Sequence, residues 1–498
     1  MQREKLISRL MNVTALLAVI YLLNMLGNYG LYDGYLDHGE PIVAAAAFKM
    51  LDGASVYPPF DGPNFTSNVY GPYLYLVNGL FLGVFGGSAW SGKISGLIAI
   101  FISVILVWRS YRALPHYQIL LAVIFMVAFI VLFVPYSIWN RPDPMLVMAV
   151  AASVLIIRVG TSLPRWVNWV VLGGLGGVAL GFKIYGPLFF IPVGMYVAIR
   201  DKSITSLLVM SVVGFTTALL PFVLEEFPLT NLLAWFSAVA EKPNDGAMVT
   251  KALRYGVFFL LPAIVLLLQR IMMLKSLSKC MSDAETVYAL LTFFCAGFCV
   301  MLAAKPGAGM YYLLPIAPLS IDMMMRIIDN TREEYQYRTI VAGAILVAAM
   351  LVTAVPVQKR FFRALEWDRT TSIKMDLHKI MQAHPGKSIQ MAVGSTIAGY
   401  HNTLQKTELI YAGNPYTVDF GVMIETSYIG ILPSDSLIQS FIECGTDVWL
   451  VPKDEEPLEM IGYYGNKIVD VSMRNAFMEA YIKSSSSAYF DLWTCRGD

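Results

Sequence analysis

The sequence predicts a polytopic α-helical membrane protein followed by a small α/β domain. The 498-residue chain is 57% hydrophobic and only 14% charged, with a mean hydropathy of +0.60, whereas a soluble domain carries about a quarter charged residues. Apolar runs of about 18 or more residues recur through the first 357 positions, which is the length a bilayer requires. Polar residues return after that point. The net charge of +1 gives no reason to expect nucleic-acid binding.

The first apolar run lies in "MQREKLISRLMNVTALLAVIYLLNML" at the start of the chain. A basic flank precedes a long apolar stretch, and no small-residue cleavage site follows it. This pattern predicts a retained first membrane helix rather than a removed signal peptide.

Eleven apolar segments are predicted to span the membrane. They are 8–27, 92–108, 117–135, 143–160, 167–182, 184–200, 204–224, 254–272, 286–304, 308–328 and 338–357. The stretch "YGPYLYLVNGLFLGVFGG" at 70–87 is also apolar, but if it crossed, every later cluster of Lys and Arg would move to the outer side. The positive-inside rule therefore favours an interfacial or re-entrant helix there.

This topology puts three segments on the external side of the membrane: the first loop (28–91), a short loop (136–145) and the tail. We accordingly predict a transmembrane domain at 1–357 and an external domain at 358–498.

The tail alternates strand-like and helix-like patterns. "SIQMAVG", "TDVWLVP" and "AYFDLWTC" are typical of strands and "SDSLIQSFIEC" of a helix, so a small α/β domain is expected. "SSSS" at 484–487 is interpreted as low complexity. Cys444 and Cys495 would share an oxidising compartment and could form a disulfide.

The first loop contains "YLDHGEPIVAAAAFKMLDG" at 35–53. Pro41 suits a first helical position, so Glu40 would lie at the positive end of a short helix, where an ionised carboxylate is favoured. Asp37 lies one bend earlier. A carboxylate held at the membrane surface suits a general base for a hydroxyl nucleophile. The alternative is that Asp37 and Glu40 only cap the helix and face water.

The short loop "NRPDP" at 140–144 is stiffened by two prolines. Asp143 could position an acceptor or bind a cation, and Arg141 could pair with a phosphate. The alternative is a local salt bridge between the two side chains.

Two lysines lie at expected span ends beside helix-breaking residues: Lys183 in "GFKIYGP" and Lys305 in "AAKPGAGMYYLLP". A phosphate is one plausible partner for such a lysine, and snorkelling to the headgroups is the alternative. Aromatic residues including Tyr70 and Tyr311 crowd the same side. Interfacial belts explain most of them, and a few could stack on sugar rings.

In this order, the motifs resemble those of bacterial membrane glycosyltransferases of the GT-C type, the group of aminoarabinose transferases and protein O-mannosyltransferases. That family has acidic residues in its first external loop, then alanines and "ML" in a surface helix. The matching positions here are Glu40, Ala44, Ala47, Met50 and Leu51. "VYGPYLYL", "NRPDPMLVMAV", "GFKIYGPLFFIP" and "KPGAGMYYLLPIAPL" are similar to later family segments, so the resemblance covers about residues 1–330.

The resemblance implies an inverting transfer of a sugar from a polyprenyl-phosphate (undecaprenyl-phosphate) donor to a cell-envelope hydroxyl on a glycan, lipopolysaccharide or protein. It also implies a bacterial inner membrane location with the active site and C-terminus in the periplasm. The family's acids are adjacent, whereas Gly39 occupies one position here. Asp37, then Glu40, then Asp33 are therefore the candidate bases, and Arg141, Lys183 and Lys305 would meet the leaving phosphate. A divalent metal at Asp37, Glu40 or Asp143 is compatible but not required.

A transporter or lipid-linked saccharide flippase is the rival interpretation, and a membrane scaffold whose tail binds a partner is a third. Transporters place ionisable residues near mid-membrane and show internal repeats. Here the centres of the expected spans are mostly free of charge, and acids collect in loops. This distribution favours an enzyme.

Overall fold

The computed structural model describes residues 2–59, 61–66, 69–160, 164–240, 246–305, 307–431, 433–463 and 465–497. The chain is mostly helical and divides into two compact units. Unit 1 comprises Met1–Tyr29, Ser95–Leu220 and Asn244–Arg363, and unit 2 comprises Gly30–Ile94, Pro221–Pro243 and Ala364–Asp498.

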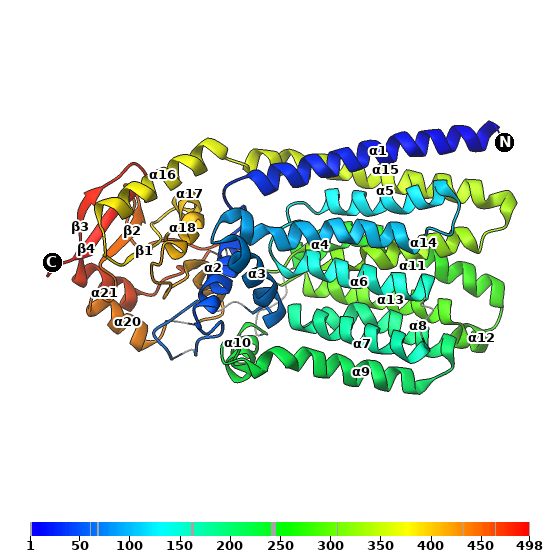
Figure 1. The fold of residues 1–498 in the computed structure, drawn as a ribbon, viewed down its shortest axis with the longest axis horizontal. Coiled ribbons are helices and arrows are strands. Elements are labelled where there is room, and N and C mark those ends of the chain that lie inside the picture. The colour runs from blue at the N-terminus through cyan, green and yellow to red at the C-terminus, as the bar shows by residue number, and fades with distance from the viewer. Residues whose placement is uncertain are drawn as a thin grey trace. The chain divides into compact units, whose positions relative to one another are not determined.

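Unit 1 is a bundle of long helices that run roughly along one direction (Figure 1). Its elements are α1 (Gln2–Leu31), α4 (Ala89–Ser110), α5 (His116–Leu132), α6 (Pro142–Val159), α7 (Arg165–Phe182), η1 (Gly186–Phe190), α8 (Ile191–Asp201), α9 (Ile204–Leu219), α11 (Gly246–Leu274), α12 (Leu277–Ser282), α13 (Ala284–Leu302), η3 (Met310–Ile316), α14 (Ala317–Asp329) and α15 (Glu333–Ala364). The last two residues of α1, the first six of α4 and the last residue of α15 are assigned to unit 2.

Within the described part of the chain, eight helical segments are long and apolar enough to cross a membrane. The three other expected spans correspond to shorter or less apolar helices: α5, α7 and α8. The segment expected at 184–200 is divided because Gly186 and Pro187 begin a 3₁₀ turn before α8 starts. The expectation of about eleven spans therefore exceeds what length and composition support.

The ambiguous stretch at 70–87 forms α3 (Pro72–Phe85), a helix of 14 residues. A spanning helix needs about 20 residues, so the length of α3 agrees with the non-crossing interpretation. Gly71 precedes it in an extended conformation, and Pro72 occupies its first turn, where a missing N–H costs nothing.

Small residues allow the helices of unit 1 to approach closely. A Cβ at Gly177 on α7 would lie 2.2 Å from the Gly214 carbonyl oxygen of α9, and one at Gly173 would lie 2.6 Å from the Met210 oxygen. Backbone contact of this kind is how apolar helices associate in lipid. A polar contact joins α1 to α15, because the Tyr21 hydroxyl donates to Gln358 Oε1 at 2.7 Å. The last helix of the bundle, α15, ends seven residues beyond the expected boundary at 357.

A buried charge network crosses one end of this bundle. The Asp322 carboxylate on α14 is fully buried and pairs with Arg158 of α6 and with Arg326, whose Nε lies 2.8 Å from Oδ2. The Tyr111 hydroxyl donates to the same carboxylate at 3.2 Å. Arg326 also reaches Glu285 at 2.9 Å. Charged groups without water are tolerated only when they are paired in this way.

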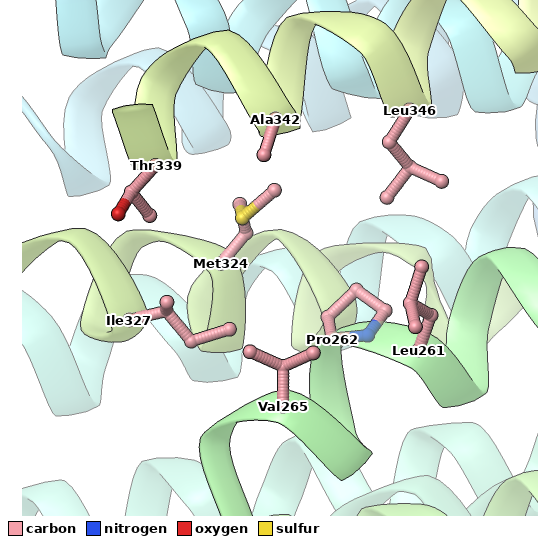
Figure 2. Close-up of a pocket in the computed structure, with 8 residues that line it drawn as sticks. All are labelled: Leu261, Pro262, Val265, Met324, Ile327, Thr339, Ala342 and Leu346. Carbon is pink, nitrogen blue, oxygen red and sulfur yellow. The ribbon is translucent and has the colours of Figure 1, made fainter. Parts of the chain in front are cut away.

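A small apolar cavity of about 120 Å³ lies among α11, α14 and α15 (Figure 2). Its lining is Leu261, Pro262, Val265, Met324, Ile327, Thr339, Ala342 and Leu346. The only hydroxyl there, on Thr339, donates to the Tyr335 carbonyl within its own helix. Such a lining offers no polar anchor for a substrate, and we assign it to imperfect helix packing.

Unit 2 contains the small sheet expected in the tail. Strands β1 (Ile389–Met391), β2 (Val448–Pro452), β4 (Phe490–Cys495) and β3 (Tyr481–Ser486) follow in that order, with β1 and β2 parallel and the other pairs antiparallel. Its helices are α2 (Gly39–Leu51), α3, η2 (Leu220–Val223), α10 (Leu229–Ala240), α16 (Trp367–Ala383), α17 (Ile397–Tyr400), η4 (His401–Gln405), α18 (Lys406–Tyr411), α19 (Phe420–Ser427), α20 (Asp435–Ile442) and α21 (Val471–Ala480).

The first loop is built into the same unit as the tail. Phe65 pairs with Val418 as a parallel β-bridge, in which Phe65 N–H donates to the Thr417 oxygen at 2.7 Å. Phe65 also packs edge-on against Trp235 of α10, and both belong to the core that the tail forms. The expected division at 357/358 therefore differs from the compact units, because the first loop and the segment around α10 group with the tail.

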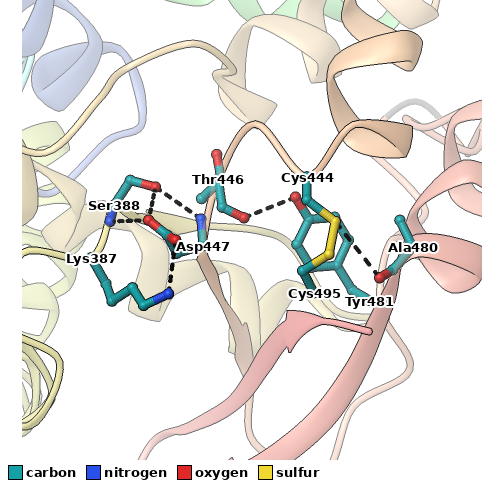
Figure 3. The surroundings of a disulfide bond; sticks show 8 residues. All are labelled: Lys387, Ser388, Cys444, Thr446, Asp447, Ala480, Tyr481 and Cys495. Atoms are coloured by element: carbon teal, nitrogen blue, oxygen red, sulfur yellow. Dashed lines mark hydrogen bonds and ion pairs between the residues drawn. A yellow bond between two sulfur atoms is a disulfide. The ribbon is translucent and has the colours of Figure 1, made fainter. Parts of the chain in front are cut away.

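The structure joins Cys444 to Cys495, with the two Cα atoms 5.9 Å apart (Figure 3). Cys444 follows α20 and Cys495 ends β4, so the bond ties a helix end to the sheet. Beside it, the Tyr481 hydroxyl donates to the Thr446 oxygen at 2.9 Å.

Replacing both cysteines by serine should lower the stability of this unit by about 4 kcal/mol, the loop-entropy value for a crosslink spanning 51 residues. The measurement is thermal unfolding of the full chain, with proteolysis at the tail as a second readout. Reducing the wild-type protein should reproduce the effect. Equal melting of the reduced and oxidised proteins would contradict it.

Candidate functional site

Unit 1 brings together four of the side chains expected to bind or orient substrate, those of Arg141, Asp143, Lys183 and Tyr311. Asp143 lies in the first turn of α6 and is fully buried, and its Oδ1 lies 3.2 Å from Nζ of Lys183. Lys183 caps the C-terminal end of α7 in an extended conformation and is also buried. The other carboxylate oxygen accepts from Trp139 Nε1 at 3.3 Å. Asp143 thus pairs with Lys183, and the interpretation that Asp143 positions an acceptor or binds a cation stays a prediction.

Arg141, just before α6, donates from a terminal nitrogen to the Tyr311 hydroxyl at 3.0 Å. Its guanidinium lies 3.8 Å from the centre of the Trp139 ring and 5.3 Å from that of Tyr311. These contacts fix the guanidinium plane by stacking. The alternative of a local salt bridge between Arg141 and Asp143 stays a prediction.

Tyrosines enclose the Lys183 ammonium. Nζ lies 4.1 Å from the ring centre of Tyr312, 4.9 Å from that of Tyr185 and 5.1 Å from that of Tyr311. The Tyr185 and Tyr312 rings stack at 4.6 Å. With Arg141 and Lys183 positive and Asp143 negative, the cluster carries one net positive charge in an aromatic surround, which suits an anionic group of low charge.

Lys305 belongs to the same unit but to a turn after α13. Its carbonyl oxygen accepts from the Ala308 N–H at 3.0 Å, and its side chain is half-buried. It follows the helix that packs against η3, the element carrying Tyr311.

Unit 2 holds the candidate bases. Asp37 Oδ1 accepts from the Gly39 N–H at 2.8 Å, and Glu40 Oε2 accepts from the Leu36 N–H at 2.9 Å. Asp37 thus accepts from the first residue of α2, whereas Glu40 accepts from a residue that precedes this helix. They differ in access, because Glu40 is 0% exposed and the Asp37 side chain is 27% exposed. Of the two carboxylates, only that of Asp37 is part-exposed, and a general base must be reached by the hydroxyl that it deprotonates.

The remaining candidates of this unit have other surroundings. Asp33 is 58% exposed and pairs with Lys374 at 2.6 Å, and that lysine also pairs with Glu408 at 2.7 Å. Tyr70 is buried ahead of α3, and its carbonyl accepts from the Tyr57 hydroxyl at 2.7 Å. These positions favour Asp37 over Asp33 as a base and give Tyr70 a packing role.

Sequence reasoning missed a group around His38, which lies between Asp37 and the helix α2. His38 Nε2 lies 3.4 Å from Oε1 of Glu425, a residue of α19. Tyr463 and Tyr400 flank the imidazole with ring centres at 6.1 and 6.5 Å. No motif marks Glu425, because it is one acid on a short helix almost 400 residues further along the chain.

Among the described residues, no group of three or more His, Cys, Asp or Glu side chains is placed to hold a metal ion. A larger groove of about 1010 Å³ lies in unit 1 along α1, α5 and α15, with mainly apolar walls. Its polar groups come from Thr14, Tyr21, Asn24, Gln358, Lys359 and Arg363.

The chain is similar to known membrane transferases. The family model of dolichyl-phosphate-mannose-protein mannosyltransferases matches residues 70–224. The crystal structure of ArnT from Cupriavidus metallidurans in the apo state aligns with a TM-score of 0.53 and 12% identity, covering 96% of this chain and 97% of that one. The crystal structure of ArnT bound to undecaprenyl phosphate aligns with a TM-score of 0.55 and 13% identity, again covering 96% of this chain and 97% of that one.

The Archaeoglobus fulgidus oligosaccharyltransferase in complex with zinc and sulfate aligns with a TM-score of 0.50 and 12% identity, over 96% of this chain and 72% of that one. No curated protein sequence matches the chain significantly. These comparisons show that the chain shares its fold with ArnT and with the oligosaccharyltransferase, and the prediction of a GT-C-like fold is confirmed. Among solved structures it is similar to ArnT along nearly its whole length.

Proposed function

We propose that the chain is a membrane glycosyltransferase that moves a sugar from a polyprenyl-phosphate donor to a hydroxyl of a cell-envelope acceptor, on the periplasmic side of a bacterial inner membrane. The observation that carries this proposal is the end-to-end similarity to ArnT, which has been solved with undecaprenyl phosphate bound. The acceptor, a glycan, a lipopolysaccharide or a protein, is left open.

The candidate residues divide the reaction into two tasks. In unit 2, the Asp37 carboxylate takes the proton of the acceptor hydroxyl, whose oxygen then bonds to the anomeric carbon. The bond between that carbon and the phosphate oxygen breaks with inversion, and the electron pair leaves on the phosphate. In unit 1, Arg141 and Lys183 meet that developing negative charge, assisted by Lys305.

The test uses membranes that contain or lack the protein, supplied with a radiolabelled sugar on polyprenyl phosphate. Label should pass to an envelope fraction only where the protein is present. Free polyprenyl phosphate should accumulate in the same molar amount as the sugar transferred. Mass spectrometry of lipid bound to the purified protein supplies an independent measure. If labelled lipid crosses vesicle bilayers while no sugar is transferred, the flippase alternative replaces the proposal.

Removing the Lys183 charge should weaken donor binding. We expect Lys183→Met to raise the donor KM about 10- to 100-fold, the range for losing one charge-assisted hydrogen bond. Lys183→Met leaves the buried Asp143 carboxylate without this partner and could destabilise the protein. The double variant Lys183→Met, Asp143→Asn removes both charges of the pair and is therefore measured as well. Lys275→Met, an exposed lysine of the same unit, is the control. A normal donor KM in the double variant would remove Lys183 from phosphate binding.

A further inference from the structure

Three elements of unit 2 meet around one imidazole. His38 precedes α2, Glu425 lies on α19, and Tyr463 follows the β-bridge residue Ile461. Both ring nitrogens face a carboxylate: Nε2 lies 3.4 Å from Glu425 Oε1, and Nδ1 lies 4.0 Å from Asp37 Oδ2. Only a doubly protonated imidazole can donate from both nitrogens. One imidazole therefore lies within 4.0 Å of both the Asp37 and the Glu425 carboxylates.

The position of Glu425 is determined by the packing of α19. Asp419 caps this helix by accepting from the Gly421 N–H at 2.8 Å, and it is itself held by Lys406 and by the Tyr416 hydroxyl at 2.6 Å. The residues before Glu425 on α19, Val422 to Ile424, are buried in the core of the tail. Because α19 is held in place by these contacts, the Glu425 side chain starts from a fixed backbone position and can orient His38.

Two phenols restrict the imidazole further. The Tyr463 ring stacks on it at an interplanar angle of 30°, and Tyr400 lies on another side at 53°. Burial, followed by the Asp37 and Glu425 charges, raises the pKa of Tyr463 to about 12, so this phenol stays neutral at physiological pH. Tyr400 is 1% exposed, and its hydroxyl has no hydrogen-bond partner among the described residues. Among the described residues, the titratable groups recorded in contact with His38 include Asp37, Glu425, Tyr400 and Tyr463.

We propose that Glu425 is a positioning residue for sugar transfer: it holds the His38 imidazole beside Asp37, and through it orients the carboxylate that accepts the acceptor proton. This inference rests on the proposed function and adds a residue of the C-terminal segment to its acceptor side. The ion-pair distances exceed those of hydrogen bonds, as is common before a substrate tightens a site. The orienting role parallels that of the third member of a catalytic triad, which acts through a histidine.

The first experiment measures His38 itself and needs no substrate. Diethyl pyrocarbonate acylates neutral imidazole, and peptide mass spectrometry reports each of the five histidines separately. In Glu425→Gln, removal of one carboxylate disfavours the imidazolium, so His38 should react several-fold faster while the other four histidines keep their rates. Glu443→Gln, an exposed acid of the same unit, should change nothing. An unchanged His38 rate in Glu425→Gln overturns the inference, whether or not the protein transfers sugar.

The second experiment is a double-mutant cycle on the transfer rate. Glu425→Gln alone should lower kcat about 10- to 100-fold with the donor KM within about twofold, a smaller loss than that of the base itself. In the Asp37→Asn background it should have no further effect, because a residue acting through Asp37 loses its target. If the two effects multiply, Glu425 acts independently of Asp37, and the inference is overturned. If His38 reacts faster in Glu425→Gln as expected but the wild-type protein transfers no sugar, the proposed function alone is refuted.

Discussion

Asp37→Asn should abolish most sugar transfer, lowering kcat about 10²- to 10⁴-fold with little change in KM, because an amide cannot take the acceptor proton. The substitution separates the two interpretations of this residue. Asparagine caps helices as well as aspartate does, and its carbonyl can still accept from the Gly39 N–H as Asp37 Oδ1 does at 2.8 Å. If Asp37 were only a cap, the variant would work normally.

The measurement is initial rate of label transfer at saturating donor, with thermal unfolding to show that the fold is intact. Asp33→Asn is the matched control, because Asp33 is an exposed acid of the same loop that pairs with Lys374. It should retain wild-type activity to within a factor of about two. A fully active Asp37→Asn, or an inactive Asp33→Asn of normal stability, would move the base elsewhere.

Asp322→Asn should destabilise unit 1 by about 3–5 kcal/mol, the cost of leaving a buried charge without its partner. Two guanidinium groups, of Arg158 and Arg326, converge on this fully buried carboxylate. Neutralising it leaves Arg158 and Arg326 with only their part-exposed partners, Asp329 and Glu285, which compensate the buried positive charges less well. The expected result is a strongly lowered melting temperature in detergent, or a loss of folded protein.

Asp329→Asn is the comparison for this network. Asp329 also pairs with Arg158, at 3.0 Å, but its side chain is 32% exposed, and partly exposed pairs contribute about 0–1 kcal/mol. Its melting temperature should therefore stay near that of the wild type. Equal melting of the Asp322 and Asp329 variants would mean that burial does not set the strength of this network.

The sequence predicted those strands and helices whose own residues show a clear apolar periodicity or a capping residue. The strand "TDVWLVP" forms β2, and "SDSLIQSFIEC" forms α20, which Ser434 caps by accepting from the Leu437 N–H. Strand β3 was missed because its serine run lacks the alternation of apolar and polar residues that marks a strand. It is stabilised by pairing with β4, which is not visible in its own residues.

In the candidate site, too, single residues could be predicted from short motifs, whereas their partners far along the chain could not. Short motifs singled out Asp37, Arg141, Asp143 and Lys183, whose neighbours along the chain are unusual for a membrane protein. The partner of Lys183, forty residues away, and the proximity of Glu425 to His38 depend on tertiary packing alone. Spacing cannot encode such pairs in a single sequence.

The bridge between Phe65 and Val418 has a consequence for biosynthesis. The two residues are separated by more than 350 positions, so the first loop cannot complete its core until nearly all of the chain has been made. Contacts of such long range form late and leave apolar surface exposed in the interval. A ribosome-stalled or prematurely terminated chain would therefore present Phe65 and Trp235 uncovered, and it should be a preferred target for quality-control proteases.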